Sequence, residues 1–137
     1  MGVVPDSTSE TTFYDQIGGY PTIKGIVDRF YAGVAEDDYL RSIYPEEDLG
    51  PAAERFTLFL VQYWGGPTTY SERRGHPALR MRHAPYPVSP KAAEHWLQHF
   101  RAGLDGAGLT PEQDAQFWGY VTRAAQFMVN TLEEPVR

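Results

Sequence analysis

Apolar residues recur at helical spacing along four long segments of this chain, which predicts four substantial helices. The first stripe follows Pro21 and contains Ile23, Ile26, Val27, Phe30, Tyr31 and Val34. The second follows Pro51 and contains Phe56, Phe59, Leu60, Tyr63 and Trp64. The third follows Ser89 and contains Ala93, Trp96, Leu97, Phe100 and Leu104. The fourth contains Phe117, Val121, Ala124, Ala125, Met128 and Leu132.

Turn and capping residues delimit these helices. Paired glycines at 18–19 and 65–66 are typical of helix ends, because glycine adopts positive φ without strain. Ser89 precedes a proline and is an expected N-cap, while Thr110 and Gln113 form a capping-box pattern. Short helices are expected near 13–17 and 37–44, and Pro135 closes the last long one. Since no useful run of strand-type alternation occurs, the sequence predicts an all-α domain.

The length of 137 residues suits a single domain. We expect a disordered N-terminal tail over 1–12, the domain over 13–132 and a short C-terminal tail over 133–137. The absence of cysteine excludes disulfides, iron–sulfur clusters and cysteine nucleophiles. No apolar run long enough for a membrane span and no secretory signal are found, so the expected location is the cytoplasm.

The segment from Tyr63 to Tyr86 is the least helix-like part of the chain and is expected to be a loop. It is rich in arginine, including Arg73, Arg74, Arg80 and Arg82, although the whole chain has a net charge of −6. These cations could bind phosphate or carboxylate groups, form a solvated face or contact nucleic acid. The overall acidity disfavours nucleic acid.

Histidines are the candidate metal ligands. His83 lies between this segment and the next helix, where a neutral imidazole could ligate a metal. On spacing alone, an ordinary capping or surface histidine is the simpler interpretation. His95 and His99 are four residues apart and could share a metal, but no matching carboxylate is evident, so two solvated histidines are favoured. His76 in Gly-His-Pro is interpreted as structural.

Tyr31, Tyr44 and Trp96 form a second candidate set. Each combines an apolar body with one polar donor, so burial requires a hydrogen-bond partner. That partner could be a backbone carbonyl in an ordinary core or a small polar ligand in a pocket. Spacing alone does not choose between them.

Several motifs together resemble one known family. They are Phe-Tyr-Asp-Gln-Ile-Gly-Gly at 13–19, Tyr-Pro-Glu-Glu-Asp-Leu at 44–49, Gln-Tyr-Trp-Gly-Gly-Pro at 62–67 and Arg-Gly-His-Pro-x-Leu-Arg-x-Arg-His-x-Pro at 74–85. This pattern resembles the truncated haemoglobins of group II, the O-type branch of the globin superfamily, over about Phe13 to Asn130. The resemblance implies a globin-like, two-over-two α-helical sandwich around haem b.

The resemblance also implies roles for individual residues. His83 falls on the position of the proximal iron ligand, and Arg82 on that of a haem-propionate partner. Tyr63, Tyr70, Phe59 and Met81 complete the expected haem-contacting set. The distal ligand-binding positions correspond to Tyr31, Tyr44, Trp96, Ala52 and Phe56. Phe56 stands where close relatives are expected to have leucine, which implies a narrower distal pocket.

The function implied is oxygen binding at ferrous haem, with Tyr and Trp donors slowing release. NO and CO are further expected ligands, and family analogy allows nitric oxide dioxygenase or peroxidase-like activity. One alternative is an electron-transfer or sensor subunit that needs a partner reductase. Another is a haem-free helical module that binds anionic partners.

Overall fold

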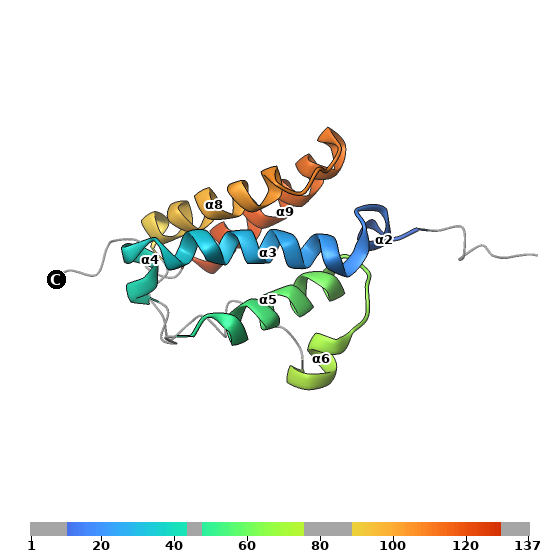
Figure 1. The fold of residues 1–137 in the computed structure, drawn as a ribbon, viewed down its shortest axis with the longest axis horizontal. Helices are drawn as coiled ribbons and strands as arrows, with labels where there is room; N and C mark the ends of the chain where they lie inside the picture. The colour runs from blue at the N-terminus through green and yellow to red at the C-terminus, as the bar shows by residue number, and fades with distance from the viewer. Residues whose placement is uncertain (1–10, 44–47, 76–88, 130–137) are drawn as a thin grey trace, which may run out of the picture.

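The computed structural model describes residues 11–43, 48–75 and 89–129, and every regular element within these ranges is a helix (Figure 1). The long helices are α3 (Gly19–Ala35), α5 (Gly50–Tyr63), α8 (Pro90–Asp105) and α9 (Pro111–Met128). The short ones are α2 (Phe13–Gln16), α4 (Asp38–Ile43) and α6 (Thr69–Arg74). The predicted all-α class is therefore confirmed. No helix in these ranges has the length and apolar character of a membrane span.

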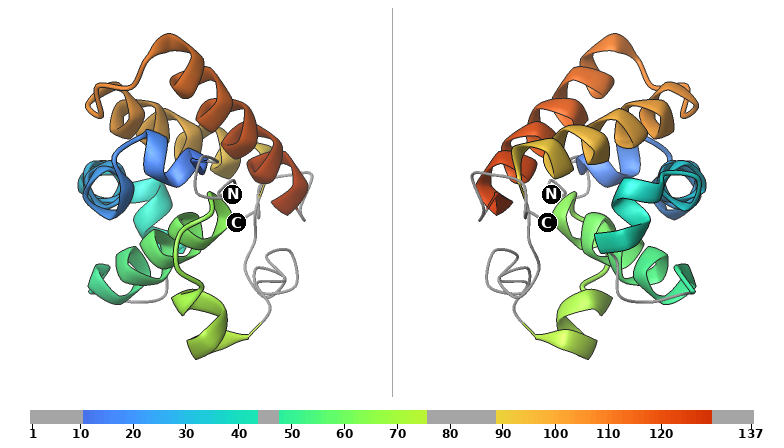
Figure 2. Two further views of the ribbon diagram at one scale, coloured as in Figure 1. Left: turned by 90° about the vertical axis from the view of Figure 1, so that its right-hand side faces the viewer. Right: turned by 90° about the vertical axis from the view of Figure 1, so that its left-hand side faces the viewer.

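The long helices pack in two pairs. Helix α3 contacts both α8 and α5, and α8 also packs on α9, so α3 and α8 form the centre of the domain. Figure 2 shows α8 and α9 on one side of the molecule and α3 and α5 on the other. The core between the pairs is aromatic and aliphatic, with Phe30, Phe100 and Phe117 all 0% exposed. Burial of these apolar faces provides the main driving force for folding.

The predicted caps are present at the starts of α8 and α9. The Ser89 hydroxyl accepts a hydrogen bond from the N–H of Ala92 at 3.0 Å. At Thr110 the capping box is complete, since the Thr110 hydroxyl and the Gln113 side chain each accept from the other residue's backbone N–H. These bonds satisfy N–H groups that have no partner within their helix.

The boundaries of two helices differ from the prediction. Helix α3 begins at Gly19, before Pro21, after Gly18 at φ 106°. Pro21 fits inside the first turn because the first N–H groups of a helix lack intrahelical acceptors. Helix α9 ends at Met128, where Val129 turns to an extended conformation, well before Pro135. Pro135 and Leu132 lie outside the described residues.

The loop predicted after Tyr63 contains helix α6, so that prediction is wrong for 69–74. The Gln62 side chain donates to the Ser71 hydroxyl at 2.7 Å and accepts from the Ser71 N–H at 2.9 Å. The Tyr70 ring is 5% exposed and packs against Phe59. Tertiary contacts to α5 therefore stabilise a helix that is too short to show periodicity.

Candidate functional site

Three aromatic side chains from three helices meet at one end of the core. We call Tyr31 of α3, Phe56 of α5 and Trp96 of α8 the distal cluster. The ring centroid of Phe56 lies 6.4 Å from that of Tyr31 and 5.7 Å from that of Trp96. All three side chains are only partly buried, whereas the core beneath them is closed. The structure thus brings together three of the five predicted distal residues.

Phe30 and Phe100 form a fixed base under this cluster. Trp96 stacks on Phe100 with centroids 5.3 Å apart and ring planes 16° apart, and it contacts Phe30 edge-on at 5.1 Å. Both phenylalanines are 0% exposed, so they hold the indole in one orientation. Ala52, the fourth predicted distal residue, is 6% exposed and lies one turn before Phe56 on α5.

The distal cluster offers polar donors in apolar surroundings. The indole N–H of Trp96 is one such donor, on a ring that packs against Phe30, Phe56 and Phe100. The Tyr31 hydroxyl is a second donor on the neighbouring helix. An aromatic wall with such donors fits a flat, apolar group such as haem that carries a small polar ligand. The described residues are therefore compatible with the expected cofactor.

The predicted haem-contacting residues of α5 and α6 lie in different surroundings. Phe59 and Tyr70 are 8% and 5% exposed, with ring centroids 5.6 Å apart. Tyr63 is 47% exposed and stacks on Tyr120 of α9 at 3.8 Å. Burial, and then the neighbouring Tyr63, raise the pKa of Tyr120 above its ordinary value of 10.0, so its hydroxyl stays protonated.

Other predicted residues fall outside the described ranges. They are Tyr44, His76, Arg80, Met81, Arg82 and His83. Of the arginines considered for anion binding, Arg73 lies 3.4 Å from Glu54 in an exposed ion pair. Arg74 lies 6.0 Å from the ring centre of Tyr70. Arg73 and Arg74 are the two of these candidate arginines that lie within the described ranges, and both contact protein neighbours.

The interpretation of His95 and His99 as two solvated histidines is wrong. Asp37, just before α4, places Oδ2 2.9 Å from Nδ1 of His95 and 2.8 Å from Nε2 of His99. Sequence reasoning missed this carboxylate because it lies 58 and 62 residues away along the chain. The only sequence signal for this contact was the four-residue spacing of the two histidines, which places them on the same face of a helix. Across the described ranges, no group of three or more His, Cys, Asp or Glu side chains is arranged to hold a metal ion.

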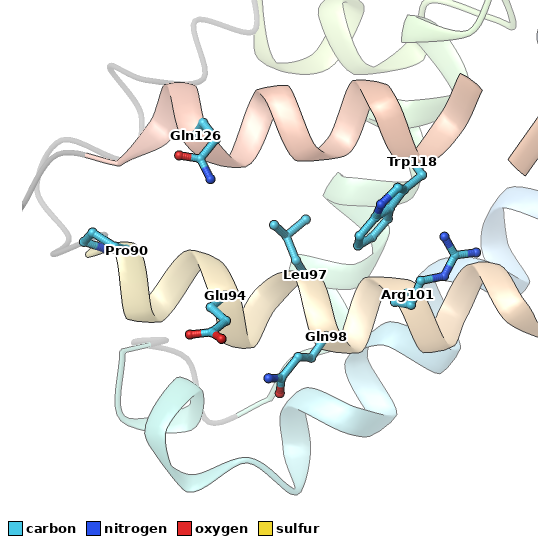
Figure 3. Close-up of a pocket in the computed structure, with 7 residues that line it drawn as sticks. All are labelled: Pro90, Glu94, Leu97, Gln98, Arg101, Trp118 and Gln126. Carbon is cyan, nitrogen blue, oxygen red and sulfur yellow. The ribbon is translucent and has the colours of Figure 1, made fainter. Parts of the chain in front are cut away.

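A shallow hollow of about 410 Å³ lies between α8 and α9 (Figure 3). Leu97 and Trp118 face one another across it, and the Arg101 guanidinium lies 4.9 Å from the Trp118 ring centre. Arg101 also pairs with Asp114 and Asp105. Arg101 lies at one end of this hollow and is already paired with carboxylates of the protein, so it is not available to fix a ligand there.

Comparison with known proteins points to one family. The sequence profile of the bacterial-like globins matches residues 12–130. The group 2 truncated haemoglobin YjbI of Bacillus subtilis is 38% identical over 120 residues, covering 88% of this chain and 89% of that protein. The solved structure of a thermostable haemoglobin from Thermobifida fusca is 54% identical with a TM-score of 0.88, covering 90% of this chain and 100% of that one. The truncated oxygen-avid haemoglobin structure from Bacillus subtilis is 38% identical with a TM-score of 0.82, covering 88% and 100%.

Proposed function

The chain belongs to the bacterial-like globin family, among the group II truncated haemoglobins, and on that premise we propose that it holds haem through His83 and binds a diatomic ligand at the distal cluster. Membership of this family implies haem-based binding of oxygen or another small ligand. It also confirms the two-over-two helical fold expected from the sequence motifs. Haem, when bound, supplies the iron to which O2, NO or CO attaches.

The convergence of Tyr31, Phe56 and Trp96 from three helices carries this proposal. In this arrangement Trp96 donates a hydrogen bond to a ligand that bears partial negative charge, and Tyr31 supplies a second donor. Phe30 and Phe100 hold the indole in place, so the donor needs little reorganisation when a ligand arrives. Phe56 and Ala52 form the apolar wall. Tyr44 is proposed as a further donor on its sequence position alone.

The proposal for the haem-contacting residues rests mainly on the sequence. His83 supplies the imidazole for the iron, and the adjacent Arg82 pairs with a propionate. Met81, Phe59, Tyr63 and Tyr70 are proposed to contact the ring or its edge. Burial of the Phe59 and Tyr70 rings on one side of α5 supports an apolar lining there. The exposed position of Tyr63 is compatible with a contact to a propionate at the edge of the haem.

Two donors among apolar rings favour slow ligand release, which suits storage, sensing or redox chemistry better than bulk transport. The oxygen-avid relative from Bacillus subtilis supports this expectation. The identity of the cofactor as haem b, a partner reductase, nitric oxide dioxygenase or peroxidase-like activity and a cytoplasmic location stay predictions.

Visible spectroscopy and stopped-flow kinetics test the proposal on the purified, haem-loaded protein. We expect a strong Soret band that shifts on reduction and on CO addition and is lost or altered in His83→Ala. Trp96→Phe should speed O2 dissociation by roughly tenfold, since a lost hydrogen bond of this kind corresponds to about 1.4 kcal/mol. A flat spectrum after haem is added back would overturn the proposal and favour the module that binds anionic partners.

A further inference from the structure

A polar cluster that the ligand site does not use joins α8 to the junction of α3 and α4. It consists of Asp37, His95 and His99, and we call it the Asp37–His cluster. Oδ2 of Asp37 lies 2.9 Å from His95 Nδ1 and 2.8 Å from His99 Nε2. The side chains are only 12%, 27% and 22% exposed, so water competes weakly for these bonds.

The direction of these hydrogen bonds follows from the carboxylate. An ionised carboxylate oxygen only accepts, so His95 donates through Nδ1–H and His99 through Nε2–H. The other oxygen, Oδ1, accepts from the backbone N–H of Leu40 at 3.2 Å and caps α4. Burial alone would raise the pKa of Asp37, but the bonds from both histidines and Leu40 outweigh it and hold the pKa well below its usual range. One ionised side chain thus connects α4 and α8.

The two histidines lie on either side of Trp96 along α8. His95 and His99 are one helical turn apart and share a face, whereas Trp96 is rotated about 100° from His95. Trp96 therefore points to Phe30 and Phe100 while the histidines point to Asp37. Two anchors on one turn restrict both sliding and rotation of that turn. The direction of the indole is restricted with it.

The contact between α3 and α8 leaves little room for adjustment. A Cβ added at Gly33 would overlap the His99 ring, and one added at Gly103 would lie 2.7 Å from the carbonyl oxygen of Ile26. The His95 ring also packs against Tyr39, with centroids 4.7 Å apart. A change in the Asp37–His cluster should therefore shift the turn that carries Trp96, because close-packed interiors transmit strain.

We propose that Asp37 is a positioning residue for the distal site. By accepting hydrogen bonds from His95 and His99, it fixes the turn of α8 from which Trp96 directs its indole N–H at a bound ligand. This inference rests on the proposed function, because the orientation of Trp96 matters only if the indole is a ligand donor. In this proposal Asp37 acts through α8, whose His95 and His99 it holds.

Asp37→Ser separates positioning from capping. Serine is a good N-cap for α4 but is too short to reach both histidines. In the haem-loaded protein we expect O2 dissociation to be about threefold to tenfold faster, since loss of donor alignment weakens a ligand bond without removing the donor. The C–O stretch of the CO complex, measured by infrared spectroscopy, should move toward its value in Trp96→Phe. In the Trp96→Phe background, Asp37→Ser should change neither quantity.

Matched variants complete the test. Asp38→Ser makes the same charge change at an exposed neighbour and should match the wild type. His99→Leu should behave like Asp37→Ser, whereas His99→Gln, which keeps an N–H near the Nε2 position, should restore the wild-type values. If Asp37→Ser does not fold, the comparison of His99→Leu with His99→Gln tests the inference in its place.

Three outcomes would overturn the inference. In the first, Asp37→Ser and His99→Leu leave the C–O stretch and the O2 off-rate unchanged while Trp96→Phe alters both, so the proposed function survives alone. In the second, Asp37→Ser has the same effect with and without Trp96, which means that it acts through general packing. In the third, Trp96→Phe leaves both the C–O stretch and the O2 off-rate unchanged, which would show that Trp96 is not a ligand donor and would contradict that part of the proposed function as well.

Discussion

Phe56 stands in the distal cluster at a position where we expect close relatives to have leucine. Its ring contacts Tyr31, Trp96 and the buried Phe30, so it fills the space beside the donors. We expect Phe56→Leu to speed CO association roughly fivefold, as for a barrier lowered by about 1 kcal/mol. The variant should cost about 1 kcal/mol in unfolding free energy. Flash photolysis measures the rate of CO association. Phe56→Tyr keeps the ring and is the control. Equal CO association rates in the wild type, Phe56→Leu and Phe56→Tyr would contradict the view that the Phe56 ring hinders ligand entry.

The sequence indicated candidate residues where the chemistry of a side chain and its place on a helix stripe were enough to single it out. Tyr31 and Trp96 were candidates because a donor on an apolar stripe requires a partner, and the family resemblance placed them at the distal site. The structure brings both side chains to the same cluster. The structure shows that Asp37 accepts a hydrogen bond from the Leu40 N–H at the start of α4. Its bonds to His95 and His99 were missed because they depend on how α3 and α8 cross, which no local pattern encodes.

At the scale of helices, the α3–α8 contact depends on a glycine. Gly103 lies inside α8, and a Cβ there would lie 2.7 Å from the backbone oxygen of Ile26. Gly103→Ala should therefore lower the unfolding free energy by about 1–3 kcal/mol, although alanine is the better helix former.

Gly119 of α9 is the matched control for this substitution. An added Cβ there meets only the flexible end of Arg123. Gly119→Ala should then raise the unfolding free energy by up to about 1 kcal/mol in urea denaturation. Opposite signs for the two variants are the expected result. A stabilising Gly103→Ala would mean that the two helices separate at little cost.

Helices with local signals were predictable and those without were not. Ser89 and Thr110 predict the starts of α8 and α9, because their side chains accept hydrogen bonds from N–H groups in the first turns of these helices. Helix α6 was missed since its first residue follows Thr68, which makes no side-chain cap, and its six residues are too few for periodicity. Its stability comes from Gln62 and from the burial of Tyr70, which are tertiary contacts.

On the scale of the whole molecule, the Asp37–His cluster links the two helix pairs and makes their association depend on pH. The pKa of Asp37 in the folded protein lies below its ordinary value of 3.8. The folded state therefore binds this proton less readily than the unfolded state does. Ionised Asp37 contributes its full stabilisation above pH of about 4, and the contribution is lost as the pH falls further.

Asp37→Ser removes this contribution, so the difference in unfolding free energy between wild type and variant should depend on pH. We expect about 2 kcal/mol at pH 7, the size of a charged hydrogen-bond network, shrinking as the pH falls below about 4. Urea denaturation followed by circular dichroism gives both values, and the pH dependence common to the two haem-loaded proteins cancels in their difference. Asp38→Ser lacks the histidine contacts and should differ little from wild type at every pH. A wild-type advantage over Asp37→Ser that stays constant from pH 7 to about pH 3 would mean that the ionised carboxylate does not hold the helix pairs together.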